Sequence, residues 1–258
     1  RHTRLQGDWS SDVCSSDLRL QGDAYGSWSL VEVVPLERYL LGVVPFEIGA
    51  GAPAAALEAQ AVLARTWALR NQGRFAVDGY HLCADTQCQV YGEPAAASGA
   101  VRRAVEASRS QVLSFNGQPI HAVYHASNGG VSAGYEEVWG GPPWPYLRPA
   151  IDAPASGSGS LVARLPLPLS AAGVADLLAH GGQAYGNDHP RFRWSRSVDA
   201  ATIARAVASQ APGLGLPSSV TVLERGASGR VLALKIQGRG PALVLRLDAI
   251  RQIGRAHV

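Results

Sequence analysis

An alanine-rich segment at residues 54–72, AAALEAQAVLARTWALRNQ, limits what this chain can fold into more than any other stretch. Pro53 precedes it, at a place that the first turn of a helix tolerates, and Gly73 follows it as a stop signal. Small or apolar residues recur along one helical stripe: Leu57, Ala61, Ala64 and Ala68. Because alanine side chains let other backbone approach closely, we expect this helix to be buried at the centre of the fold.

Helix and strand signals surround this segment without regular alternation. Before and just after it we expect a strand at residues 27–34, a short helix over 36–43, a tight glycine-rich turn at 46–51 and a second helix over 93–108. Later we expect a hairpin over 111–127 that turns at Asn116–Gly117, a strand and helix over 192–210 with Ser197 or Asp199 near the N-cap, and short strands over 218–250. This pattern predicts an α+β fold, with a mixed sheet packed on the buried helix and a β-rich C-terminal part.

The two ends of the chain look foreign to the rest. One oligonucleotide, read in opposite orientations, can encode both DVCSSDL at residues 12–18 and IGRAHV at 253–258, and it resembles a sequencing adapter. We therefore expect residues 1–18 and 253–258 to be adapter-derived and the absence of Met to mean that the natural start is missing. Between them we predict a catalytic core over 19–154 and, after the linker APASGSGS, a second α+β part over 155–252.

Composition excludes some classes of function. The chain has 258 residues, and its 23 basic and 20 acidic residues leave a net charge of +3. No basic stripe interleaved with aromatic residues is present, so nucleic-acid binding has little support. No apolar run reaches the roughly 18 residues of a membrane helix.

Glu47 and Arg65 are the first candidates for chemistry. Glu47 lies in GVVPFEIGAG, among apolar and small residues at the entrance to the expected buried helix. Partial desolvation would help such a carboxyl hold a proton and act as a general acid, whereas the plainer interpretation is a helix cap or an arginine partner. Arg65, in the middle of that helix, needs an anionic partner if it is buried, and Glu47 or a substrate carboxylate would serve.

The segment YHASNGG, residues 124–130, is the second candidate. We expect a strand to end at His125, Ser127 and Asn128, followed by two glycines that leave room for a ligand. Polar groups at a strand end suit the wall of a cleft, and the plainer interpretation is a glycine turn with a solvated histidine.

The cysteines leave two alternatives open. With Cys14 assigned to the adapter, only Cys83 and Cys88 remain, spaced Cys-x4-Cys after His81. These three residues, with His121 or His125 as a fourth ligand, form a loose zinc pattern. A disulfide that closes a small loop fits equally well in an exported protein, and a catalytic cysteine is the weakest reading because nothing marks one thiol as activated.

Together these segments resemble the SpoIID/LytB family, the stage II sporulation protein D group. The resemblance rests on YLLGVVPFEIGAGAPAAALEAQAVLARTWAL, on QCQVYGEP, on YHASNGGVSAGYEEVWGGPPWPYLRPAID and on the later SGRVLALKIQG and RLDAIR. They occur in the order of the family and span about residues 32–251.

The resemblance implies a lytic transglycosylase in the cell envelope that cleaves the β-1,4 bond between N-acetylmuramic acid and N-acetylglucosamine in peptidoglycan, preferably in glycan without stem peptides. It implies that Glu47 is the catalytic acid/base and that Arg65 orients Glu47 or holds a sugar substituent. We expect a glycan-binding cleft with further contacts from Gln60, Gln89, Tyr91, Tyr124, His125, Ser127 and Asn128. No cofactor is required by this chemistry.

The sequence departs from the family pattern in two places. Gln87 stands where zinc-binding relatives carry a histidine, which weakens the case for zinc at His81, Cys83 and Cys88, and the segment that follows Arg251 in the family is replaced by adapter.

The main rival function is a non-catalytic wall-binding module that positions or stimulates an amidase. A further alternative is a hydrolase that pairs Glu47 with Glu136, Glu137 or Asp152.

Overall fold

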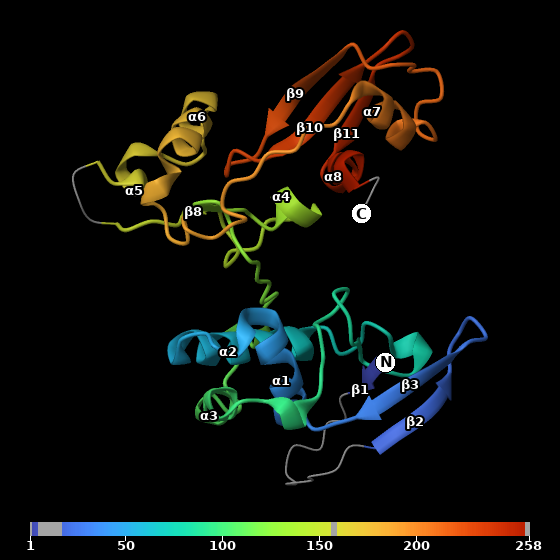
Figure 1. Cartoon of the computed structure of the whole chain (residues 1–258), viewed down its shortest axis with the longest axis vertical. Coiled ribbons are helices and arrows are strands. Elements are labelled where there is room, and N and C mark those ends of the chain that lie inside the picture. Colours follow the sequence, from blue (N-terminus) through green and yellow to red (C-terminus); the bar gives the residue numbers. More distant parts are fainter. Residues whose placement is uncertain (1, 5–16, 156–158, 256–258) are drawn as a thin grey trace. The chain divides into compact units, whose positions relative to one another are not determined.

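A computed structural model describes residues 2–4, 17–155 and 159–255, and the chain divides into two compact units, residues 1–124 and 125–258 (Figure 1). The division falls before the 154/155 boundary expected from the sequence. Helices and short sheets are mixed in both units, which confirms the α+β class.

Unit 1 begins with a small sheet and continues with helices. Its elements are β1 (His2–Arg4), β2 (Asp17–Gly22), β3 (Trp28–Val33), α1 (Leu36–Val44), a π-helical turn η1 (Pro45–Gly49), α2 (Ala54–Arg70), η2 (Ala76–Asp78), β4 (Leu82–Cys83), η3 (Pro94–Ala96), α3 (Gly99–Ala107), β5 (Ser114–Phe115) and β6 (Gln118–Pro119). The sheet has the order β2-β3-β1-β4, with β1 parallel to β3 and antiparallel to β4. Strand β1 and the start of β2 lie in the segment assigned to the adapter. Strand pairing uses backbone groups that any residue type supplies, so the pairing does not bear on the origin of these residues.

The alanine-rich helix is the centre of unit 1, as the sequence predicts. All four stripe residues of α2 are fully buried: Leu57, Ala61, Ala64 and Ala68. They share one core with the inner faces of α1 and α3, and these three helices lie together beside the sheet (Figure 1). Small side chains on α2 allow this close packing.

The glycine-rich turn expected at residues 46–51 is instead a single π-helical turn that continues α1. Pro45 has no N–H to donate and interrupts the hydrogen-bond ladder, which favours a wider turn there. Gly49, with φ +88°, lies in the left-handed region where the turn ends. The effect is to carry Glu47 on a regular turn rather than on an irregular loop.

Two other expectations in unit 1 are confirmed over part of their length: α3 covers 99–107 of the helix expected over 93–108, and the hairpin covers 114–119 of the expected 111–127. Helix α3 begins at its N-cap Ser98, whose hydroxyl accepts from the Val101 N–H. The hairpin turns at Asn116 and Gly117, whose φ values of 51° and 74° are both positive, as a two-residue type I′ turn requires.

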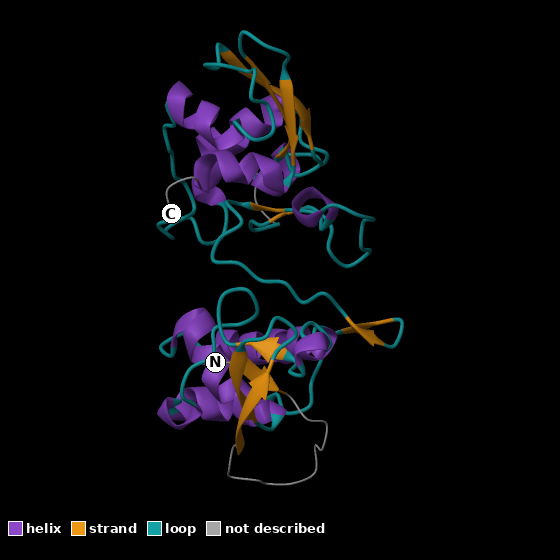
Figure 2. Ribbon diagram, turned by 90° about the vertical axis from the view of Figure 1, so that its right-hand side faces the viewer, coloured by secondary structure: helices purple, strands orange, loops and turns teal. Residues whose placement is uncertain are grey.

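Unit 2 contains a three-stranded sheet and several short helices. Its elements are β7 (Val131–Ser132), α4 (Glu136–Trp139), β8 (Ala150–Ile151), α5 (Leu161–Arg164), α6 (Ala171–His180), η4 (Gly181–Gln183), α7 (Ala200–Val207), β9 (Ser219–Arg225), β10 (Val231–Gln237), β11 (Leu243–Arg246) and α8 (Asp248–Arg255). The antiparallel order is β11-β10-β9. Helices pack on one face of this sheet (Figure 2), and residues of α7 and α8 share one core with residues of β10 and β11. Asp199 is the N-cap of α7, and the strand expected before it is absent from the described residues 192–198.

Candidate active site around Glu47

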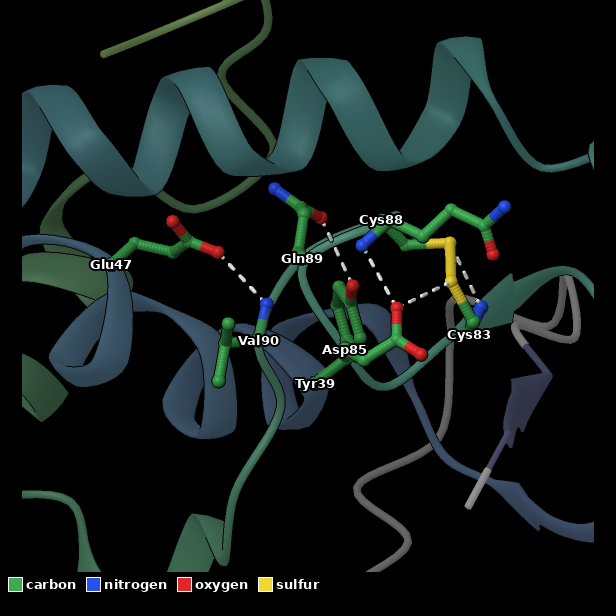
Figure 3. The surroundings of a disulfide bond; sticks show 8 residues. Tyr39, Glu47, Cys83, Asp85, Cys88, Gln89 and Val90 are labelled. Carbon is green, nitrogen blue, oxygen red and sulfur yellow. Dashed lines mark hydrogen bonds between the residues drawn. A yellow bond between two sulfur atoms is a disulfide. The ribbon is translucent and has the colours of Figure 1, made fainter. Parts of the chain in front are cut away.

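Glu47 is half-buried on the π-helical turn, and its carboxylate is held by backbone from a distant segment. The Val90 N–H donates to Glu47 Oε1 over 2.8 Å (Figure 3). Pro53 is the N-cap residue of α2 and no side chain caps the helix, so the plainer role of Glu47 as the cap of that helix is not observed. One carboxylate oxygen is thus fixed while the side chain keeps access to solvent.

The segment that carries Val90 is tied by the two cysteines. Cys83 and Cys88 form a disulfide with a Cα–Cα separation of 5.6 Å, and Asp85 Oδ1 accepts from the Gln87 N–H inside the loop (Figure 3). Of the two alternatives left open by the sequence, the structure has the disulfide. Both sulfurs are then bonded to each other, and neither is the thiolate that zinc needs. Among the described residues no group of three His, Cys, Asp or Glu side chains is placed to hold a metal ion.

Gln89 lies between the disulfide and Val90 and is completely buried. Its Oε1 accepts from the Tyr39 hydroxyl at 3.0 Å, and its Nε2 donates to the Tyr124 hydroxyl at 3.1 Å and to the Ala64 carbonyl at 3.4 Å. These bonds connect α1, α2 and the segment that leads out of unit 1. Burial is therefore compensated by hydrogen bonds at both ends of the amide.

Tyr124 connects this buried group to Glu47. Burial raises the pKa of Tyr124 above its ordinary value, and the charge of Glu47 and a side-chain hydrogen bond to it raise it further, against a lowering by Gln89. The pKa of Tyr39 is also raised, chiefly by burial and then by Tyr124 and Glu47. Both hydroxyls consequently keep their protons at neutral pH.

Tyr91 fixes the same segment against α1. Its ring stacks on Tyr39 with centroids 5.3 Å apart, and it lies against Gly42, where a Cβ would come within 2.5 Å of a ring carbon. The Gly92 N–H donates to the Gly42 carbonyl at 2.9 Å. A glycine inside a helix often marks such a close approach, so Gly42 was the signal that sequence reasoning passed over, together with Tyr39.

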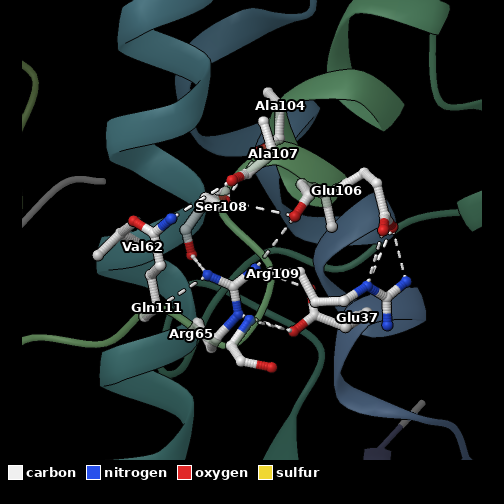
Figure 4. Close-up of polar contacts among 12 residues, drawn as sticks. Glu37, Val62, Arg65, Ala104, Glu106, Ala107, Ser108, Arg109 and Gln111 are labelled. Atoms are coloured by element: carbon white, nitrogen blue, oxygen red, sulfur yellow. Dashed lines mark hydrogen bonds and ion pairs between the residues drawn. The ribbon is translucent and has the colours of Figure 1, made fainter.

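Arg65 has a different partner from the one expected. Its Nε and Nη2 donate to the two carboxylate oxygens of Glu37 at 2.9 and 2.7 Å, and its Nη1 donates to the Gln111 carbonyl at 3.0 Å (Figure 4). Only 1% of Arg65 is exposed. Its anionic partner is therefore Glu37 in the first turn of α1, where the sequence predicted Glu47 or a substrate carboxylate.

Gln60 is likewise buried, at 6% exposure on α2. Its Nε2 has no hydrogen-bond partner among the described residues. Of the residues expected to contact a substrate, Gln89, Tyr91 and Tyr124 lie in unit 1 near Glu47, and the first two are buried.

Residues 127–130, SNGG, belong to unit 2, and the strand expected to end there is not observed. Asn128 Oδ1 accepts from the Gly130 N–H at 2.8 Å and Asn128 Nδ2 donates to Asp152 at 2.7 Å, while Ser127 Oγ accepts from the Gly129 N–H. Asn128 therefore stabilises its own turn, for which Gly129 and Gly130 adopt positive φ. His125 is exposed.

The carboxylates considered for a hydrolase also lie in unit 2. Glu137 is 6% exposed and accepts from the backbone N–H of Gly134 and from the N–H and hydroxyl of Ser228. These bonds tie α4 to the turn between β9 and β10. They give Glu137 a structural role, and Asp152 accepts a hydrogen bond from Asn128.

Comparisons with known proteins divide the chain much as the structure does. Residues 24–115 match the model of the family described as stage II sporulation protein (SpoIID), and residues 133–257 match a domain family of unknown function, DUF8618. In the described residues no helix is both long and apolar enough to cross a membrane.

Among curated proteins, the chain is 40% identical over 100 residues to the amidase enhancer of Bacillus subtilis, covering 39% of this chain and 13% of that protein. It is 34% identical over 134 residues to stage II sporulation protein D of the same species, covering 46% of this chain and 38% of that protein. An uncharacterized protein of Brachyspira hyodysenteriae is 32% identical over 115 residues, covering 43% of this chain and 30% of that protein. The chain thus spans well under half the length of each relative.

Proposed function

Residues 24–115 belong to the SpoIID family, and from this premise we propose that the chain is a lytic transglycosylase of the cell envelope that acts on peptidoglycan glycan strands. The observation that carries the proposal is the environment of Glu47. Its carboxylate is half-buried, is fixed by the Val90 N–H and interacts with Tyr124. A positioned carboxyl that keeps access to solvent is what proton transfer to a bound glycan needs.

The proposed reaction uses one carboxyl group twice. Glu47 first gives its proton to the glycosidic oxygen while the bond between that oxygen and C1 of N-acetylmuramic acid breaks. The Glu47 carboxylate then takes the proton of the C6 hydroxyl of the same sugar, and the C6 oxygen bonds to C1. The products are a free 4-hydroxyl on N-acetylglucosamine and a 1,6-anhydro end, and no water is consumed.

The hydrogen bonds of two other carboxylates also support this reading of Glu47. A glycosidase that uses water needs a second carboxyl about 5 to 9.5 Å from the first. Two of the three carboxylates considered for that role, Glu137 and Asp152, are engaged by Ser228 and Asn128. Intramolecular attack by the C6 hydroxyl makes the second carboxyl unnecessary. Arg65 then contributes through the packing of α1 on α2, since it is buried with Glu37.

A second candidate function follows from the similarity to the amidase enhancer. In that reading the chain binds the glycan and positions or stimulates a cell-wall amidase without cleaving sugar bonds. The two candidates share a ligand, so glycan binding does not separate them.

The products separate them. Glycan strands freed of stem peptides are incubated with the chain, and the ends are analysed by mass spectrometry. The transglycosylase proposal expects 1,6-anhydromuramyl ends, which are one water lighter than hydrolytic reducing ends. Reducing ends would instead indicate the two-carboxylate hydrolase. Intact glycan, with faster release of stem peptides when a cell-wall amidase is added, would support the second candidate.

A further inference from the structure

The buried amide of Gln89 can face its neighbours in only one orientation. Its Nε2 lies 3.4 Å from the Ala64 carbonyl oxygen, which can only accept, and its Oε1 lies 3.0 Å from the Tyr39 hydroxyl, which can donate. Exchanging the two ends of the amide would place two acceptors against each other at Ala64. The backbone of α2 therefore fixes which end of Gln89 donates.

This orientation determines what Tyr124 does with its proton. Gln89 Nε2 donates to the Tyr124 oxygen at 3.1 Å, so that oxygen acts as an acceptor toward Gln89. The single hydroxyl proton is left for another partner, and the Glu47 carboxylate, whose charge helps to raise the pKa of Tyr124, is the candidate acceptor. A hydroxyl can accept and donate at once, which makes Tyr124 the link between a fixed amide and the proposed catalytic acid.

We propose that Gln89 and Tyr124 form a directional hydrogen-bond chain, Tyr39 to Gln89 to Tyr124 to Glu47, in which Tyr124 is a positioning residue that presents its proton to the Glu47 carboxylate. The inference rests on the proposed function for its catalytic meaning and deepens it by adding the group that steadies Glu47. Tyr124 holds the carboxylate that Glu47 becomes once it has protonated the leaving oxygen. The Val90 N–H, on the residue after Gln89, donates to Oε1 of the same carboxylate.

The kinetic test compares two tyrosines that differ in their place in the chain. Tyr124→Phe removes the donor to Glu47, and we expect kcat on stem-free glycan to fall about tenfold with KM within about twofold, as for the loss of one hydrogen bond to a charged group. Tyr39→Phe removes a donor to Gln89, whose orientation Ala64 still fixes, so kcat should fall less than threefold. Tyr39 is the more deeply buried of the two, so a purely structural role predicts the opposite order.

A second readout does not depend on activity. The side-chain amide protons of Gln89 and the backbone amide proton of Val90 are followed by nuclear magnetic resonance in the wild type, Tyr124→Phe and Glu47→Gln. The chain of bonds predicts that Glu47→Gln shifts the Gln89 amide signals through Tyr124, and that this shift disappears when Tyr124→Phe is combined with it.

The outcomes are distinct. Equal kcat losses in Tyr39→Phe and Tyr124→Phe would overturn the directional chain. So would Gln89 amide signals that do not shift in Glu47→Gln. A wild type without anhydro products, but with Gln89 signals that respond to Glu47→Gln, would overturn the proposed function and the catalytic use of Tyr124 while the bond direction stands.

Discussion

Val90 donates its backbone N–H to Glu47 Oε1 over 2.8 Å, and it does so from a segment that begins two residues earlier at a disulfide-bonded cysteine. The position of the carboxylate is thus tied to the covalent closure of the loop between Cys83 and Cys88. Five connected features hold one short segment in place: the disulfide, the buried amide of Gln89, the Val90 N–H, the ring of Tyr91 and the Gly92 contact with α1.

Reduction of the disulfide should destabilise unit 1 and weaken the placement of Glu47. A closed loop this short restricts the unfolded chain by about 2 kcal/mol in the chain-entropy view. We expect urea unfolding to show a loss of about this size in reduced wild type. The Cys83→Ser/Cys88→Ser double variant should match the reduced protein and be insensitive to reductant. If oxidised and reduced wild type unfold at the same urea concentration, the loop does not depend on the bond.

Arg65→Met should be strongly destabilising because it leaves the half-buried Glu37 carboxylate without its bidentate partner. Loss of one member of a buried ion pair costs about 3 kcal/mol or more. Denaturant unfolding measures the change. Arg109→Met, which breaks the exposed pair with Glu106, is the matched control and should change little. A normal unfolding midpoint in Arg65→Met would show that the pair carries little stability.

Gly42→Ala should displace the segment that holds Glu47. The new methyl would lie 2.5 Å from a Tyr91 ring carbon and 2.7 Å from the Gly92 carbonyl oxygen, so one side must move. Overpacking of this kind costs about 1–3 kcal/mol. Thermal unfolding and the Val90 amide signal report the change. Gly51→Ala, with open space around the added methyl, is the control, and equal effects of the two substitutions would contradict the tight contact.

Alkaline pH should destabilise unit 1 through Tyr39 and Tyr124. Burial raises the pKa of both above the ordinary value, so above about pH 10 the unfolded chain loses these protons while the folded chain keeps them. The free energy of unfolding then falls with rising pH, by up to about 1.4 kcal/mol per pH unit for each tyrosine. Unfolding midpoints between pH 9 and 11 check this. The slope should be shallower in Tyr124→Phe, and an unchanged slope would mean that Tyr124 is not shielded.

Local sequence signals predicted much of the framework. Helix α2, the Asn116–Gly117 turn and the Asp199 cap follow from propensity and spacing, which act within a few residues. The Glu37 partner of Arg65 and the Val90 partner of Glu47 lie 28 and 43 positions away, and no local pattern specifies such contacts. The strand expected to end at residues 127–130 is not observed, and there too a side-chain contact decides the local structure. There the Asn128 side chain bonds backbone and Asp152 and organises a turn.

The role of Glu47 is tested most directly by the products of a single matched pair of variants. Wild type, Glu47→Gln and the exposed α2 control Glu58→Gln are incubated with stem-free glycan, and 1,6-anhydromuramyl ends are counted by mass spectrometry. We expect equal release by wild type and Glu58→Gln and a loss of at least about a hundredfold in Glu47→Gln, since proton transfer is worth that much. Glu47→Gln that still forms anhydro ends at the wild-type rate would contradict the account.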